Sequence, residues 1–115
     1  MIFSYTISKK DGVIIYSLQG ELIDRNQASV MMEEIEDTIS KNENKILLNL
    51  KELRYINSSG LNILINILTK ARKSGGDVAI CEVNKKISEL LLITKLNSVF
   101  NVCDSVEKAI AVLNK

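Results

Sequence analysis

Apolar and polar residues alternate along the chain with two different periods, and these periods predict the order of strands and helices. Positions 3–8 alternate strictly, which is typical of a half-exposed strand. Residues 9–12 end in an Asp-Gly pair, which favours a hairpin leading to a second strand over residues 13–19. A helix is expected over residues 25–41, because its apolar positions recur at helical spacing. These positions are Ala28, Met31, Met32, Ile35 and Ile39.

The second half of the chain continues this alternation. A nearly continuous apolar run at residues 46–50 is short enough to be a buried strand. A helical pattern follows from about Ser59 to Lys73 and stops at Ser-Gly-Gly. The order continues with a strand over residues 77–81 and a helix capped by Asn84. It ends with a strand over residues 99–103 and a helix capped by Asp104, with Glu107 as its capping-box partner. We therefore expect an α/β fold with a mixed sheet of about four to five strands and about four helices packed on it.

Length and composition limit the kinds of function that the chain can have. Its 115 residues, 46% of them hydrophobic, suit a single domain over residues 1–115. The 15 basic and 14 acidic residues are interspersed and leave a net charge of +1, which gives no electrostatic footprint for nucleic acid. None of the three tyrosines and two phenylalanines lies in a basic cluster. We therefore expect no nucleic-acid partner.

Other features argue against a membrane protein, a metalloprotein or an enzyme. No apolar run reaches the roughly 18 residues of a membrane-spanning helix, and the N-terminus lacks the regions of a signal peptide. Cys81 and Cys103 lie far apart, which predicts reduced thiols in a cytoplasmic protein. Histidine is absent, which removes the usual general base and the commonest transition-metal ligand. We expect no catalytic residue, cofactor or bound metal.

The polar residues Asn57, Ser58 and Ser59, followed by Gly60, stand where the central buried strand passes into a helix. Such junctions, at the carboxyl ends of strands, are where α/β proteins place their sites. A structural interpretation is that Asn57 or Ser58 caps the helix while Gly60 permits close packing. A functional interpretation is that Ser58 is phosphorylated, because a helix N-terminus tolerates negative charge. Both interpretations remain open from these residues alone.

Two neighbouring features also have two interpretations. Beside the apolar stripe of the helix, Ile63 and Ile67 flank Asn62 and Asn66. This flank either packs under another helix, which we favour for Ile67, or lines a partner-binding edge made of Asn62, Ile63 and Asn66. Asp24 precedes a helix and has Gln27 three residues later, so a capping pair is favoured over a role in docking.

Three segments of the chain resemble the STAS domain, and more narrowly the stand-alone anti-sigma factor antagonists of bacteria. They are GELIDRNQASVMMEEIE, ILLNLKELRYINSSGLNILINILTKARKSGGDVAI and LNSVFNVCDSVEKAIAVL. The hallmark of the family is a strand followed by Asp-Ser-Ser/Thr-Gly-Leu, which residues 57–61 match as Asn-Ser-Ser-Gly-Leu.

The resemblance implies a phosphorylation-controlled regulator of transcription that works by partner switching. Ser58 would be the phosphorylation site. The unphosphorylated protein would bind an anti-sigma factor that is also a serine kinase, a phosphatase would reverse the modification, and the chain itself would not be an enzyme. The partner-binding residues would be Asp24, Asn57, Ser58, Ser59, Gly60, Asn62, Ile63 and Asn66.

The sequence departs from the family pattern at two positions. Asn57 replaces the usual Asp, and Ile23 stands where another family Asp is expected, with Asp24 one residue later. An alternative is a STAS interaction module that is not phosphorylated, within a signalling scaffold or a transport assembly. An enzyme with a serine nucleophile is disfavoured, because the sequence has no histidine to act as the base. A nucleotide site at the same helix N-terminus is also disfavoured, because the sequence has no Gly-rich phosphate loop there.

Overall fold

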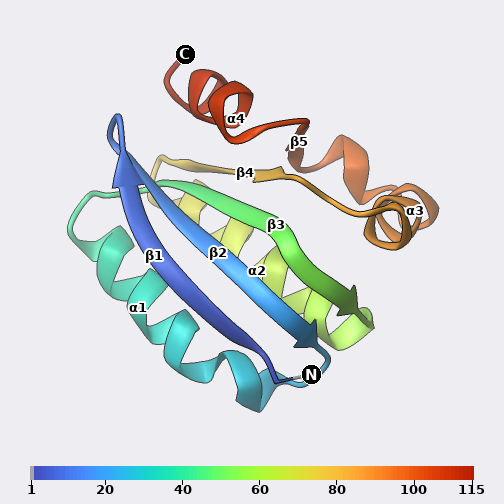
Figure 1. Cartoon of the computed structure of the whole chain (residues 1–115). Coiled ribbons are helices and arrows are strands. Elements are labelled where there is room, and N and C mark those ends of the chain that lie inside the picture. Colours follow the sequence, from blue (N-terminus) through green and yellow to red (C-terminus); the bar gives the residue numbers. More distant parts are fainter. Residues whose placement is uncertain (1) are drawn as a thin grey trace.

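A five-stranded mixed sheet forms the centre of the computed structural model, which describes residues 2–115 (Figure 1). The hairpin pair β1 and β2 is antiparallel, whereas β2, β3, β4 and β5 are mutually parallel neighbours. The carboxyl ends of these four parallel strands therefore point to one edge of the sheet. In spatial order, the strands are β1 (Ser4–Lys10), β2 (Val13–Leu22), β3 (Lys45–Ile56), β4 (Asp77–Cys81) and β5 (Asn101–Cys103).

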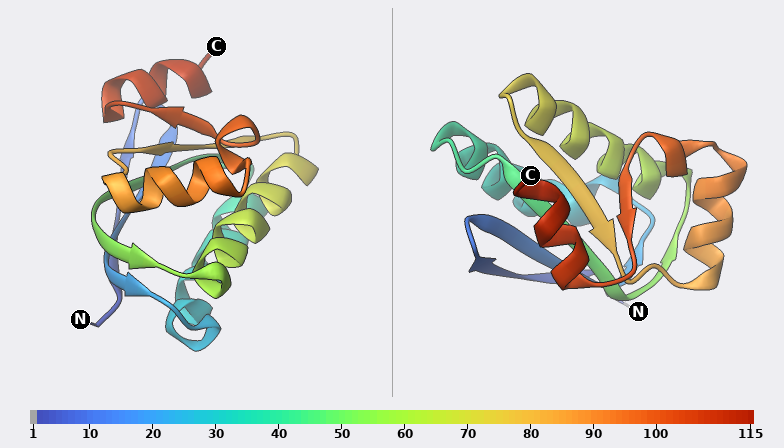
Figure 2. Two further views of the ribbon diagram at one scale, coloured as in Figure 1. Left: turned by 90° about the vertical axis from the view of Figure 1, so that its right-hand side faces the viewer. Right: turned by 90° about the horizontal axis from the view of Figure 1, so that it is seen from above.

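Helices cover both faces of the sheet (Figure 2). α1 and α2 pack on one face, α4 packs on the other, and α3 lies beside the carboxyl-terminal half of β3. Two short 3-10 helices precede α1 and β5. The bounds are η1 (Arg25–Ala28), α1 (Ser29–Ser40), α2 (Ser58–Lys73), α3 (Lys85–Ile93), η2 (Leu96–Ser98) and α4 (Val106–Leu113). No helix in residues 2–115 is long and apolar enough to cross a membrane.

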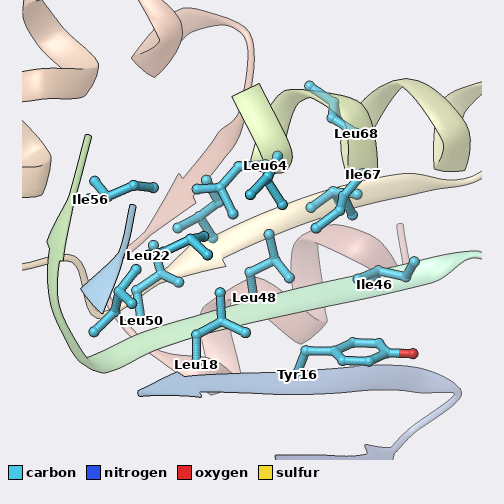
Figure 3. Packing of buried hydrophobic residues seen from close by; sticks show 14 of the residues in the cluster. Tyr16, Leu18, Leu22, Ile46, Leu48, Leu50, Ile56, Leu64, Ile67 and Leu68 are labelled. Atoms are coloured by element: carbon cyan, nitrogen blue, oxygen red, sulfur yellow. The ribbon is translucent and has the colours of Figure 1, made fainter. Parts of the chain in front are cut away.

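The core has two parts because β3 is buried on both faces. Ile46, Leu48 and Leu50 pack with β2 and α2 in the larger part (Figure 3), whereas Leu47 packs under α4 in the smaller one. This two-sided burial explains why residues 46–50 form a nearly continuous apolar run. In contrast, the side chains of the edge strand β1 are exposed except for the half-buried Tyr5, so β1 is more exposed than the half-exposed strand that its alternating pattern predicts.

The expected mixed α/β sheet with four α-helices is confirmed. The hairpin turns at Asp11 and Gly12, both with positive φ, as an Asp-Gly turn requires. The helix expected over residues 25–41 begins as the 3-10 helix η1 and continues as α1. β3 runs six residues past its expected end at Leu50, because residues 52–56 stay paired with β2 across two register shifts.

The expected N-cap of the last helix was wrong, and the last strand is shorter than expected. Ser105, not Asp104, caps α4 by accepting a hydrogen bond from Lys108 N, while the Asp104 carboxylate pairs with the Lys108 ammonium at the surface. The expected capping pair with Glu107 is therefore absent. β5 begins at Asn101 rather than Val99, because the amides of Val99 and Phe100 donate to the carbonyl oxygen of Leu96, the first residue of η2.

Candidate functional site

The end of β2 and the end of β3 lie side by side, and this brings together residues that are far apart in sequence. Leu22 is paired with Ile56 at the last position of the two strands. The residues that follow each strand, Ile23 and Asp24 on one side and Asn57 and Ser58 on the other, therefore meet at the same edge of the sheet.

Asn57 uses both ends of its amide group at this edge. Its Oδ1 accepts a hydrogen bond from Gly60 N at 2.9 Å, which caps α2. Its Nδ2 donates to the carbonyl oxygen of Ile23 at 3.1 Å, which ties the start of α2 to the segment after β2. An aspartate could accept the first bond but could not donate the second. The Asn side chain therefore makes a pair of bonds that an aspartate cannot make in the same geometry.

Gly60 allows α2 to begin directly against the end of β2. A Cβ atom at this position would lie 2.1 Å from the carbonyl oxygen of Leu22 and 2.6 Å from Cγ1 of Ile56. No side chain fits in this space, so the packing role expected for Gly60 is observed. Because Gly60 is buried, it positions its neighbours and offers no side chain to a partner.

Ser58 is the first residue of α2, and its side chain is exposed. Its hydroxyl makes no hydrogen bond or ion pair with residues 2–115. It lines a hollow of about 290 Å³, which we call the Ser58 hollow, between the start of α2 and the side of α3. Of the residues that line it, only Lys86 carries a charge at neutral pH. The lining residues are Tyr55, Ile56, Asn57, Ser58, Lys86, Ile87 and Leu90. Ser58 is therefore accessible for modification, but no base in the hollow would activate it as a nucleophile.

The flank of α2 that carries Asn62, Ile63, Asn66 and Ile67 is partly buried and partly exposed. Ile67 is fully buried in the larger core, so it offers no side chain to a partner, and its packing under a neighbouring helix stays a prediction. Asn62 and Asn66 are exposed and follow Ser58 at intervals of four residues, so the three lie along one face of α2. Ile63 is only 4% exposed and contributes to the floor of a groove.

This groove, of about 550 Å³, separates η1 and α1 from α2. Its lining residues are Arg25, Asn26, Ser29, Met32, Glu36, Ile63, Asn66 and Lys70. Sequence reasoning missed Arg25 and Asn26, whose only signal was their position directly after Asp24. Lys70 is paired with Glu36 at 2.7 Å, whereas Arg25 has no ion-pair or hydrogen-bond partner among the described residues.

Asp24 forms the expected capping pair with Gln27. Its Oδ1 accepts a hydrogen bond from Asn26 N at 2.9 Å, and Oε1 of Gln27 accepts one from Asp24 N, also at 2.9 Å. The pair caps the 3-10 helix η1 and so holds the segment to which Asn57 is tied. Its role in docking stays a prediction. Ser59 is half-buried beside Ser58.

Groups with a displaced pKa lie outside the Ser58 hollow and outside the groove beside α2. Burial raises the pKa of Cys81 to about 12, and burial also raises the pKa of Cys103. Burial, with a hydrogen bond to Glu34, raises the pKa of Tyr5 to about 12. Both thiols are therefore protonated at neutral pH and are poor nucleophiles. The described part of the chain contains no cluster of three or more side chains that could hold a metal ion.

Comparison with known proteins identifies the family. The sequence matches the STAS domain family over residues 4–109. The chain belongs to the STAS domain family. The matched residues include β3, the polar turn at Asn57 and α2.

Several proteins similar to this chain are named as anti-sigma factor antagonists. BtrV of Bordetella bronchiseptica, named as a proposed anti-sigma factor antagonist, is 31% identical over 92% of this chain and 90% of its own length. The anti-sigma F factor antagonist of Paenibacillus polymyxa is 29% identical over 89% and 87% of the two chains. The crystal structure of a proposed anti-sigma factor antagonist from Thermotoga maritima has a TM-score of 0.87, with 27% identity over 96% and 95% of the chains.

Proposed function

We propose that this STAS domain is an anti-sigma factor antagonist that is switched off by phosphorylation of Ser58. The observation that carries the proposal is the exposed, unbonded hydroxyl of Ser58 at the edge where β2 and β3 end. The similar anti-sigma factor antagonists support the choice of partner class. The partner is an anti-sigma factor with serine kinase activity, and a serine phosphatase reverses the modification.

The proposed partner surface extends from Ser58 along α2. Ser58, Asn62 and Asn66 offer polar groups on one face of the helix, and Ile63 lies at the floor of the adjacent groove. Asp24 belongs to the rim because its capping pair holds η1 beside this face. Asn57, Ser59 and Gly60 contribute by fixing the geometry of the turn. This surface combines an apolar floor with a polar rim, as protein interfaces generally do.

Phosphorylation would act on binding and leave the fold intact. A phosphate adds roughly −1.5 to −2 charges at neutral pH. The Ser58 side chain is exposed, so this charge meets water in the free protein. In a complex, the same charge would lose much of its contact with water, at a cost of several kcal/mol. A loss of about 4 kcal/mol weakens binding about a thousandfold.

In this proposal the chain acts as a single regulatory domain in the cytoplasm. It receives a phosphoryl group and binds a protein, without catalysing a reaction, and it affects transcription through the sigma factor that its partner releases. The absence of histidine from the sequence and of a base in the Ser58 hollow agrees with this role.

Intact mass spectrometry after incubation with ATP and the cognate anti-sigma kinase tests the proposal. Wild type and Ser59→Ala are expected to gain one phosphate, and Ser58→Ala none. Ser59→Ala is the matched control, because it removes the adjacent hydroxyl of the same turn. A phosphate that remains on Ser58→Ala would contradict the assignment of the switch to Ser58.

A second candidate is a STAS interaction module that is never phosphorylated. The neutral Asn57 favours it, because the charge usually present beside the serine is missing. The two candidates differ in one outcome of the same experiment. A wild-type protein that co-elutes with the kinase on a sizing column but gains no phosphate would support the unmodified module and overturn the switch.

A further inference from the structure

The wall of the Ser58 hollow that faces α2 belongs to α3, and Lys86 is its only charged residue at neutral pH. The ammonium of Lys86 makes no ion pair or hydrogen bond with residues 2–115. The remaining lining is apolar or neutral. An accessible hydroxyl and an unpaired cation therefore line the same cavity from two different helices.

The side chain of Asn84 attaches the first turn of α3, which carries Lys86, to the strand that precedes Ser58. Asn84, the N-cap of α3, donates from Nδ2 to the carbonyl oxygens of Leu53 and Arg54, at 3.1 and 3.2 Å. These carbonyls belong to β3, which ends at Ile56, two residues before Ser58. The same Asn84 accepts a hydrogen bond from Ile87 N at 2.9 Å. The first turn of α3 is thus attached to the strand that carries Ser58.

The charge of this first turn is unusual for a helix. Lys85 and Lys86 open α3, and the turn contains no acidic residue. Cations at a helix N-terminus oppose the helix dipole and are unfavourable. A negative group that arrives next to Lys86 would remove this repulsion. The local electrostatics of α3 therefore favour an anion in the Ser58 hollow.

We infer that Lys86 binds the phosphate placed on Ser58, so that the modified side chain is held across the hollow against α3. The inference rests on the proposed phosphorylation of Ser58 and adds how the phosphate is held. The phosphate would occupy a hollow whose other walls include Tyr55, Ile87 and Leu90. Modification would then block this apolar pocket to a partner side chain in addition to repelling the partner by charge.

The test uses full-length protein with phosphoserine installed at position 58 during translation, so that no kinase is needed. The second ionisation of the phosphate is followed by ³¹P NMR between about pH 5 and 8, where phosphoserine titrates. A nearby cation favours the dianion and lowers this pKa, so Lys86→Gln is expected to raise it by about half a unit. Lys86→Arg keeps the cation and is expected to restore the wild-type value.

Lys85→Gln is the matched control, since it removes the same charge from the adjacent exposed residue that does not line the hollow. It is expected to leave the titration unchanged. Equal shifts for the two variants, or no shift for Lys86→Gln, would overturn the inference and leave the switch itself untouched. Conversely, failure of the kinase to modify wild-type protein would overturn the switch, whatever the titration gives.

Discussion

At the scale of single residues, Asn57 shows how one side chain joins two roles. It caps α2 through Gly60 N and ties the helix to the carbonyl of Ile23. The neutral amide therefore makes a bond that an aspartate at this position could not donate. Substitutions at residue 57 can therefore separate the contribution of the cap from that of the bond to Ile23.

Asn57→Ala is expected to lower the free energy of unfolding by about 1–2 kcal/mol, because it removes the cap of α2 and the bond to Ile23. Asn57→Asp keeps the acceptor and gains a favourable charge at the helix N-terminus, so its loss is expected to stay below about 1 kcal/mol. Urea unfolding followed by circular dichroism measures both. A larger loss for Asn57→Asp than for Asn57→Ala would contradict this prediction, because both variants lack the donated bond, and would show that the Asp carboxylate repels the carbonyl oxygen of Ile23.

Gly60→Ala is expected to destabilise the protein by about 3 kcal/mol or more, because the new Cβ would lie 2.1 Å from the carbonyl oxygen of Leu22. Helix propensity alone predicts the opposite sign, a gain of up to about 1 kcal/mol. Thermal unfolding of the two proteins decides between the two effects. Ser59→Ala, one position earlier, is the control and is expected to change stability by less than about 0.5 kcal/mol. A stabilised Gly60→Ala protein would show that the strand end moves away freely.

At the scale of elements, the site depends on how α2 and α3 are attached to β3. α2 continues the chain directly from β3, whereas α3 is held against it by the side chain of Asn84. The Ser58 hollow lies between these two helices, so its shape depends on the attachment of α3 to β3 through Asn84.

Asn84→Ala is expected to cost about 2–3 kcal/mol, because it removes the cap of α3 and leaves the carbonyls of Leu53 and Arg54 without this donor. Faster amide exchange in α3 than in α2 would place the loss in α3. Ser105→Ala, which removes the cap of α4 on the other face, is the comparison and should leave exchange in α3 unchanged. Uniformly faster exchange in all helices would contradict a local role for Asn84.

At the scale of the whole molecule, the carboxyl ends of the four parallel strands lie at one edge of the sheet. β1 extends the sheet as an antiparallel strand beside β2. The face that packs against α1 and α2 carries the larger core and holds Tyr5 and Tyr16 near Glu34 and Thr38. The stability of this core is therefore linked to proton binding at alkaline pH.

The free energy of unfolding is expected to fall as the pH rises from about 10 to about 12. The Tyr5 phenol ionises near pH 10 in the unfolded chain but keeps its proton to about 12 in the folded one, so alkali favours unfolding. The raised pKa of Cys81 adds to the fall from about pH 9. Tyr5→Phe is expected to flatten the dependence above pH 10, as measured by urea unfolding at each pH. An unchanged slope in Tyr5→Phe would contradict this link.

The order of the elements and the cap at Asp24 could be predicted from the sequence, because each depends on residues close together in the chain. The packing role of Gly60 could be predicted from its place in a strand-to-helix turn, although its contact with Leu22 is distant in sequence. The bond from Asn57 to Ile23 joins residues 34 positions apart, so no local pattern contains it. The presence of Ser58 and Lys86 in one hollow likewise depends on the sheet. At α4, Asp104 and Ser105 both fit the preferences for a cap, and only the path of the chain selects Ser105.

The bonds of Asn84 have a further consequence for the behaviour of the protein in concentrated solution. β4 pairs with β3 only as far as Asn49, so the rest of β3 has no strand on that side. Asn84 occupies two of the carbonyls that a neighbouring strand would otherwise use. Detachment of α3 would expose a strand edge on which another chain can add, which is how proteins aggregate. The side-chain amide of Asn84 therefore favours solubility, because it keeps α3 over this strand edge, and it also maintains the shape of the Ser58 hollow.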